Sequence, residues 1–415
     1  MKILWVKGGK LLPADTGGRL RSYNLLRFLA QKHQVTLLSY YGGKRDLQYE
    51  SEIREHLPGA ITIYTATLDS KAFARALDYL IRLPQSAPHA VSKFTHPKVA
   101  RTVAEFVNQR IFDGAVSDFL SASLNFPRKL HTPTVLFQHN VESALWRRMA
   151  DVEANPVAKL AYKLESAKMM RYERAALRRF HRVIAVSNYD RELMLQMEPA
   201  CKISVVGTGV DTNRFTMAPP STSRLPRIVF TGSMDWEPNI DAMEYFCRKI
   251  LPRVQREIPE ITLQIVGRNP HKKVQRLASS SVEVTGTVPS VEPYLKEASV
   301  VIIPLRIGGG TRLKIFEAMA MGKALVSTSI GAEGLNLENG RDIIIADEPA
   351  SFAEAVLLLL RNDNVRRNYE QAAAQVASKH DWSRIAAQFA GALQQTIEEQ
   401  ANFHNRPTAL VLGPS

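Results

Sequence analysis

The chain has 415 residues, 45% of them hydrophobic and 23% charged, which suits two globular domains and excludes a disordered or fibrous protein. Its two cysteines, Cys201 and Cys247, lie far apart and near no Cys/His cluster, so neither a disulfide framework nor a zinc site is supported. The net charge is +14, and residues 1–215 hold 32 basic against 19 acidic residues, so nearly all the excess lies in the first half.

The first half of the chain alternates strand-like and helix-like patterns. An apolar run at residues 2–6 precedes a glycine-containing loop, a helical pattern at 22–33 and a second apolar run at 34–41. Three further strand-like runs end in small or polar residues: FDGAVSD, TPTVLFQHN and HRVIAVSN. A long basic helix is predicted between the last two, over residues 157–182. These patterns predict an N-terminal Rossmann-like domain over residues 1–212.

The second half repeats the alternation after a break. Residues 213–226 are rich in Pro, Ser and Thr, which is typical of a linker. A helix is predicted at 241–257, among the strand-like runs RIVFTGS, ITLQIVG, VEVTGTV, VVIIPL, ALVST and DIIIA. We predict a second Rossmann-like domain over 227–381, a helix over 382–404 that returns to the first domain, and a tail over 405–415. Ligands of doubly wound sheets bind beyond the carboxyl ends of the strands, so the cleft between the domains is the expected site.

A glycine-rich stretch after the run VVIIPL is the most informative segment. Its residues Gly308, Gly309 and Gly310 have no side chain to keep a ligand from the backbone. Thr311 is predicted to cap a helix that ends at Gly322. The free N–H groups and positive dipole of such a helix end attract an anion, and a diphosphate is a suitable one.

Charged residues follow this stretch on the predicted helix. Arg312 and Lys314 add positive charge, and Glu317 shares a helical face with Lys314, where its carboxylate can accept hydrogen bonds from ribose hydroxyls. In the alternative interpretation, the glycines form only a turn and Glu317 pairs with Lys314 at the surface.

This segment resembles the donor-site motif of glycosyltransferase family 4. That resemblance implies an α/β fold of GT-B architecture, in which two Rossmann-like doubly wound domains face each other across a cleft. Family members carry two glutamates eight positions apart, and Glu317 with the following Ala-Met-Ala-Met-Gly matches the second half of the motif. Gly309 stands where the first glutamate is expected, so the contact which that carboxylate is thought to make with the donor sugar is missing.

A second departure concerns the loop after the first strand of the second domain. The family often places an Arg and a Lys there to hold the donor phosphates, whereas this chain has Ser233 and Pro238. We infer that Arg312 and Lys314 supply the missing charge, because a diphosphate in an uncharged loop would be unfavourable.

The resemblance covers nearly the whole chain and implies further site residues. It implies that the donor contacts Gly17, Gly18, Gly232, Ser233, Arg268 and Val288, the last of these backing the base. It also places His139 against the donor sugar; a structural histidine that caps a strand end is the alternative.

The resemblance implies transfer of a sugar from a nucleotide diphosphate with retention of configuration. The donor would be a UDP- or GDP-sugar, and the acceptor a glycan or a lipid-linked molecule in bacterial polysaccharide or glycoconjugate assembly. Catalysis would be electrostatic and assigned to His139, Arg312, Lys314 and Glu317. We expect no cofactor and no metal, since no Asp-x-Asp occurs and the nearest pattern is Asp235-Trp236-Glu237.

The basic first half leaves two interpretations open. The helix at 157–182 either attaches to an anionic membrane or is simply solvated. We expect a cytoplasmic protein, because the leading apolar run is too short for a signal peptide. Peripheral association with the inner face of the plasma membrane is compatible with this expectation. We expect no nucleic-acid partner, since no recognisable nucleic-acid module occurs. The first alternative function is a catalytically weak GT-B partner subunit, motivated by Gly309. The second is a basic nucleic-acid-binding protein, motivated by the charge of the first half.

Overall fold

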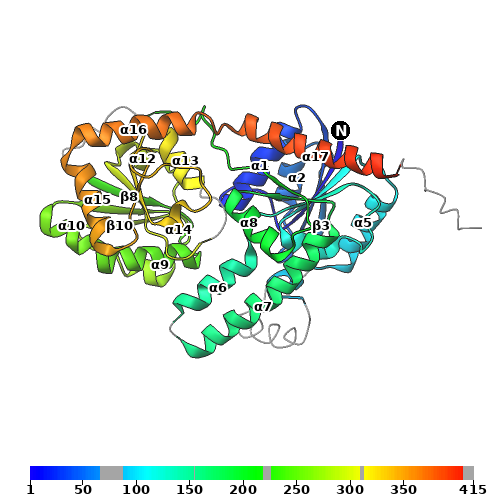
Figure 1. The fold of residues 1–415 in the computed structure, drawn as a ribbon, viewed down its shortest axis with the longest axis horizontal. Helices are drawn as coiled ribbons and strands as arrows, with labels where there is room; N and C mark the ends of the chain where they lie inside the picture. Colours follow the sequence, from blue (N-terminus) through cyan, green and yellow to red (C-terminus); the bar gives the residue numbers. More distant parts are fainter. Residues whose placement is uncertain (66–86, 154, 218–225, 309–312, 405–415) are drawn as a thin grey trace, which may run out of the picture.

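The computed structural model describes residues 1–65, 87–153, 155–217, 226–308 and 313–404, which form two α/β domains side by side (Figure 1). Four residues of the predicted phosphate-binding segment lie outside the described residues, namely Gly309, Gly310, Thr311 and Arg312. The predicted tail at 405–415 also lies outside them. The two parallel sheets confirm the predicted fold class of two doubly wound Rossmann-like domains.

The N-terminal sheet is parallel, and its described strands follow the order β3-β2-β1-β4-β5-β6-β7. These strands are β1 (Lys2–Gly8), β2 (Gln34–Tyr41), β3 (Ile61–Tyr64), β4 (Gly114–Asp118), β5 (Thr134–Phe137), β6 (Arg182–Ala185) and β7 (Ile203–Val205). In the register of β1, Trp5 pairs with Leu37 of β2 and Val116 of β4. The sequence patterns do not predict the two edge strands β3 and β7, most of whose residues are only partly buried.

Helices cover both faces of this sheet. They are α1 (Gly17–Leu29), α2 (Leu47–His56), α4 (His89–Ser92), α5 (Pro97–Asn108), the 3-10 helix η1 (Leu120–Asn125), α6 (Glu142–Val152), α7 (Pro156–Arg179) and α8 (Asn188–Met197). Helices α1 and α2 pack on one face and α5, α7 and α8 on the other, so alternate residues of β1 enter two separate cores. The basic helix predicted at 157–182 is α7, which ends at Arg179 because Arg182 already belongs to strand β6.

The C-terminal sheet is also parallel, and its described strands follow the order β10-β9-β8-β11-β12-β13. These are β8 (Arg227–Thr231), β9 (Thr262–Val266), β10 (Val282–Gly286), β11 (Val300–Ile303), β12 (Leu325–Ser327) and β13 (Ile344–Ile345). Its helices are α9 (Glu237–Tyr245), α10 (Leu251–Glu257), α11 (Lys272–Gln275), α12 (Glu292–Glu297), α13 (Leu313–Ala320), α14 (Ser329–Ala332), α15 (Pro349–Arg361) and α16 (Asp363–Ala377).

The helix predicted at 241–257 differs in two respects. It begins at Glu237, and a π-helical turn over Phe246–Ile250 joins α9 to α10. Pro252 accounts for the wider turn, because proline has no N–H and its ring crowds the carbonyl one turn earlier.

The last described helix, α17 (Trp382–His404), leaves the C-terminal domain and lies across the N-terminal domain (Figure 1). Phe389 of α17 is fully buried, and its ring centroid lies 5.2 Å from that of Trp5 and 5.1 Å from that of Phe137. At the crossing, the amide of Val210 donates a 2.8 Å hydrogen bond to the carbonyl of His380. Two chain segments therefore run side by side between the domains.

Helices α6 and α7 form a hairpin that projects from the N-terminal domain, away from both sheets (Figure 1). None of the helices in the described part of the chain is both long enough and apolar enough to cross a membrane.

Candidate active site

The N-terminal face of the site is built around the start of α1. The Thr16 hydroxyl accepts a 3.4 Å hydrogen bond from the amide of Arg19 and caps the helix. A Cβ on Gly18 would lie 2.5 Å from Cζ of Phe119, and a Cβ on Gly17 would lie 3.3 Å from Cδ1 of Leu313 on α13. Gly18 therefore allows Phe119 to approach the helix, and Gly17 marks the place where the two domains meet.

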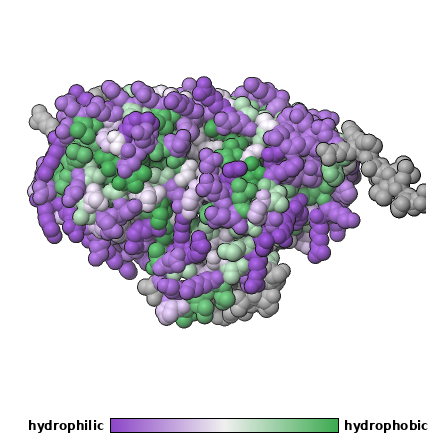
Figure 2. Space-filling model, viewed as in Figure 1, coloured by the Kyte–Doolittle hydropathy of each residue, from purple (hydrophilic) through white to green (hydrophobic). Residues whose placement is uncertain are grey.

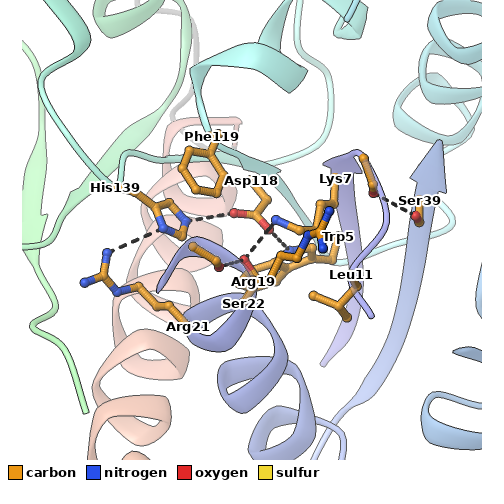
Figure 3. Close-up of polar contacts among 12 residues, drawn as sticks. Trp5, Lys7, Leu11, Arg19, Arg21, Ser22, Ser39, Asp118, Phe119 and His139 are labelled. Atoms are coloured by element: carbon orange, nitrogen blue, oxygen red, sulfur yellow. Dashed lines mark hydrogen bonds and ion pairs between the residues drawn. The ribbon is translucent and has the colours of Figure 1, made fainter. Parts of the chain in front are cut away.

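A buried polar network lies beside this helix end, where β1, β4 and β5 finish (Figure 3). Asp118 accepts hydrogen bonds from Lys7 Nζ at 2.9 Å, from Trp5 Nε1 at 3.0 Å and from His139 Nε2 at 2.8 Å. Nδ1 of His139 lies 3.4 Å from Nη1 of Arg21. Since a guanidinium can only donate, Nδ1 accepts, and the proton of the imidazole is on Nε2.

The charge states in this network follow from burial and from the ion pair. Burial lowers the pKa of His139 to about 3, despite the opposing effect of the Asp118 carboxylate. Burial alone would raise the pKa of Asp118, but the Lys7 ammonium and the hydrogen bond from His139 hold it well below its usual range. The network therefore contains a neutral imidazole between an ionised carboxylate and a guanidinium.

Phe119 keeps the imidazole in place from above. Its ring is stacked on His139 with centroids 3.6 Å apart (Figure 3). The backbone of Phe119 has φ of 69° and ψ of 158°, a conformation that favours glycine. Strain of this kind persists only where the surroundings impose it, and it is concentrated at functional sites.

The C-terminal face of the site is centred on Lys314 of α13. Its Nζ donates a 2.9 Å hydrogen bond to Asn239 Oδ1 and lies 4.0 Å from the ring centroid of Phe230. A Cβ on Gly232 would lie 2.9 Å from the same ammonium. The charge of Lys314 is therefore at the loop after β8, where the sequence has Ser233 in place of a basic residue.

Arg268 brings a second cation to the same loop. Its Nε donates a 3.3 Å hydrogen bond to the Ser233 hydroxyl, and its guanidinium lies 3.6 Å from the Asp235 carboxylate. It also lies 3.1 Å from Asp15, which belongs to the loop before α1 of the other domain. Arg268 thus joins the two domains beside the start of α1.

Two further predicted donor contacts, Glu317 and Val288, belong to the C-terminal domain. Glu317 lies on α13 one turn after Lys314, and burial raises its pKa to about 7 while Arg214 and Lys314 oppose the rise. Within the described residues its carboxylate has no hydrogen-bond partner. Val288 follows β10 and packs partly against the core of the C-terminal domain.

Arg148 is a site residue that the sequence analysis does not identify. Its two terminal nitrogens each lie 2.7 Å from a carboxylate oxygen of Glu333, and Nη1 also donates to the carbonyl of Gly308. Its Nη2 donates a 3.1 Å hydrogen bond to the Tyr189 hydroxyl. Arg148 on α6 therefore binds the C-terminal domain at the entrance to the glycine-rich segment.

Lys7, Asp118 and Arg21 are also site residues that the sequence analysis does not identify. Lys7 and Asp118 could have been found, because they are polar residues at the carboxyl ends of two predicted strands, where α/β proteins bind ligands. Among the described residues, no group of three or more His, Cys, Asp or Glu side chains is arranged to hold a metal ion.

Two doubly wound parallel sheets that face each other through helix starts and strand ends define the GT-B class of glycosyltransferase. Residues 17–214 match the family described as Glycosyltransferase Family 4, and residues 225–362 match Glycosyl transferases group 1. The chain belongs to glycosyltransferase family 4.

Two kinds of relatives accompany this assignment. The phosphatidyl-myo-inositol mannosyltransferase of Mycobacterium leprae is 30% identical over 223 residues, which are 49% of this chain and 56% of that protein. The match thus spans about half the length of this curated relative. Sucrose-phosphate synthase from Thermosynechococcus elongatus has a TM-score of 0.70 at 16% identity, covering 96% of this chain and 100% of that one. Anabaena HepE in complex with UDP and glucose has a TM-score of 0.66 at 14% identity, covering 95% and 99%. These two structures show likeness of fold alone.

Proposed function

We propose that this chain transfers a sugar, with retention of configuration, from a UDP- or GDP-sugar to a glycan or lipid-linked acceptor in bacterial polysaccharide or glycoconjugate assembly. The observation that carries the proposal is the position of Lys314. Its ammonium lies at the loop after β8, beside Gly232 and Asn239, and thus provides a cation where the loop itself has none.

In this proposal the donor diphosphate lies between Lys314, Arg268 and the start of α1. Two cations and the positive end of a helix dipole would offset about two negative charges on the diphosphate. Arg268 would exchange its contact with Asp15 for one with phosphate. Glu317 would accept hydrogen bonds from the ribose, and Val288 would lie against the base.

The sugar would lie against the N-terminal network. A pKa of about 3 makes His139 neutral near pH 7, and Asp118 and Arg21 engage both of its ring nitrogens, so in this proposal it holds the network beside the sugar in place and does not act as an imidazolium. Bond cleavage would place negative charge on the leaving diphosphate, where Lys314 and the predicted Arg312 stabilise it. The acceptor oxygen would form its bond to the anomeric carbon on the face that the diphosphate leaves, and the leaving phosphate would take the proton of the acceptor hydroxyl. Since Lys314, Arg268 and Arg312 offset the charge of the diphosphate, this scheme needs no metal.

The names of the relatives agree with this chemistry. One is named as a mannosyltransferase of a phosphatidyl lipid, and another was solved with UDP and glucose. They support a nucleotide donor and a lipid-linked acceptor for this chain as proposals.

A thermal-shift panel of UDP-, GDP- and ADP-sugars tests the proposal. We expect one base class to stabilise the protein, Arg312→Ala to abolish the shift and Glu317→Ala to reduce it. Lys249→Ala is the control, since Lys249 is exposed on the same domain. A shift that is undiminished in both site variants would mean that the donor binds elsewhere.

Turnover separates an enzyme from a partner subunit that only binds the donor. Slow hydrolysis of the stabilising sugar nucleotide, followed by mass spectrometry, is expected for the wild type. Stabilisation without hydrolysis or transfer would favour the weak partner subunit that Gly309 suggests.

A further inference from the structure

The helical hairpin of α6 and α7 has an exposed apolar surface. Figure 1 shows both helices extending away from the sheets, and Figure 2 shows hydrophobic residues at the free end of this hairpin. The exposed apolar side chains there are Val152, Val157, Leu160, Leu164 and Met170. Val157 is 77% exposed and Leu160 59%, which are unusual values for large apolar residues.

These residues form one face of α7 rather than scattered positions. Val157, Leu160, Leu164 and Ala167 are exposed, and they follow one another at intervals of three or four residues. Glu165 and Ser166, between Leu164 and Ala167, are buried, and Met169, Ala176 and Leu177 belong to the core of the N-terminal domain. The exposed apolar stripe is therefore the outer side of a helix that is fixed by its inner side.

Charge is segregated on the same helix. Both carboxylates of α7, Glu165 and Glu173, are buried. Glu173 accepts hydrogen bonds from the amides of Glu142 and Ser143 at 2.7 and 3.0 Å, and Glu165 accepts one from the amide of His89. Glu173 thus joins α7 to α6, Glu165 joins α7 to α4, and neither carboxylate lies on the outer face of α7.

Cations border the apolar stripe. Lys159, Lys163 and Arg171 have no carboxylate partner among the described residues. Arg174 and Arg178, further along the helix, both pair with Glu198. The outer face between residues 157 and 171 therefore combines apolar and unneutralised basic side chains, while Asp151 belongs to the end of α6 and Glu153 to the turn before α7.

We propose that this face of α7 docks on an anionic lipid membrane. Leu160, Leu164 and Val157 would enter the boundary between headgroups and acyl chains, and the neighbouring cations would contact anionic headgroups. Hydrogen bonds to the buried Glu173 join the two helices of the hairpin, and α6 also carries Arg148, which contacts the C-terminal domain near Gly308. Docking would thus hold the site at a fixed height above the membrane, where the lipid-linked acceptor of the proposed function is found.

Vesicle co-sedimentation tests this surface with the whole chain. The wild type is expected to sediment with phosphatidylcholine vesicles that contain about 30% phosphatidylglycerol and to remain in solution with pure phosphatidylcholine. The double variant Leu160→Asp/Leu164→Asp should bind the anionic vesicles at least about tenfold more weakly, and Lys163→Glu/Arg171→Glu should do the same. Leu358→Asp is the matched control, because Leu358 of α15 is 46% exposed, like Leu164, and should bind as the wild type does.

Two results would overturn the proposal: no sedimentation of the wild type with anionic vesicles, or equal sedimentation of Leu160→Asp/Leu164→Asp. The first result would point to a protein partner for this face. The donor-induced thermal shift, measured on the same variants, should be unchanged. A wild type that binds anionic vesicles but shows no donor-induced thermal shift would contradict the proposed function alone. A wild type that shows the thermal shift but does not bind the vesicles would contradict the docking surface alone.

Discussion

The ion pair between Lys7 and Asp118 gives a quantitative test of the buried network. Lys7 is 3% exposed and Asp118 fully buried, so Lys7→Met leaves a carboxylate in the interior without its cation. Trp5 and His139 still donate hydrogen bonds to it, but neither is charged. Breaking a buried pair in this way is expected to lower the free energy of unfolding by about 3–5 kcal/mol.

A matched variant lies three residues along the chain. Lys10 pairs with Asp46 at 2.6 Å, but this pair is partly exposed to solvent. Lys10→Met removes the same chemical group and should lower the free energy of unfolding by less than about 1 kcal/mol. The double variant Lys7→Met/Asp118→Asn should be more stable than Lys7→Met, because it no longer buries an unpaired charge.

Urea unfolding followed by tryptophan fluorescence measures these values, since Trp5 contacts Asp118 directly. A Trp236→Phe background removes the tryptophan of the C-terminal domain, so that the signal reports the N-terminal domain. A loss below about 1 kcal/mol for Lys7→Met would refute the reasoning, as would a double variant less stable than Lys7→Met.

Three further predictions concern the site and the domain interface. Burial raises the pKa of Glu317 to about 7, so the fraction of its carboxylate form increases as the pH rises from about 6 to 8. The donor-induced thermal shift should increase over the same range, because the carboxylate accepts hydrogen bonds from the ribose in the proposed site. Glu317→Gln should abolish this pH dependence, and an equal dependence in the variant would contradict the prediction. A double-mutant cycle of Arg148→Ala and Glu333→Gln should give a coupling of about 1–2 kcal/mol in urea unfolding, whereas additive effects would mean that the bidentate pair contributes nothing. Phe389→Ala should lower the free energy of unfolding of the N-terminal domain by about 3–5 kcal/mol, since the ring is fully buried between Trp5 and Phe137; a change below about 1 kcal/mol would show that α17 is not part of that core.

The sequence predicts the fold well because its signals are local. Each strand of the C-terminal sheet is a short apolar run that ends in glycine, polar or small residues, and the pattern is complete within five or six residues. Gly322, predicted as the end of α13, has φ of 64°, the conformation that favours glycine at this position. The place of Lys314 on α13 also follows from its spacing to the glycine-rich segment, whereas its contact with Asn239 joins residues 75 positions apart.

Contacts between distant parts of the chain are not predictable in the same way. Arg148 and Glu333 are 185 residues apart, and their pairing depends on how two domains approach each other. Lys7 and Asp118 are brought together by the parallel pairing of β1 with β4. The role of His139 illustrates the same limit: the sequence predicts a residue that faces the sugar, while the structure shows both of its ring nitrogens engaged by Asp118 and Arg21.

The path of α17 has a consequence for the order in which the protein can mature on the ribosome. Synthesis proceeds from the N-terminus, yet Trp5 and Phe137 are covered by a helix that is translated only after the whole C-terminal domain. The second domain can therefore complete its own core first, while the first one still exposes aromatic side chains. We expect nascent chains stalled before Trp382 to bind chaperones through this uncovered face, and full-length chains, in which α17 covers it, to lose that binding.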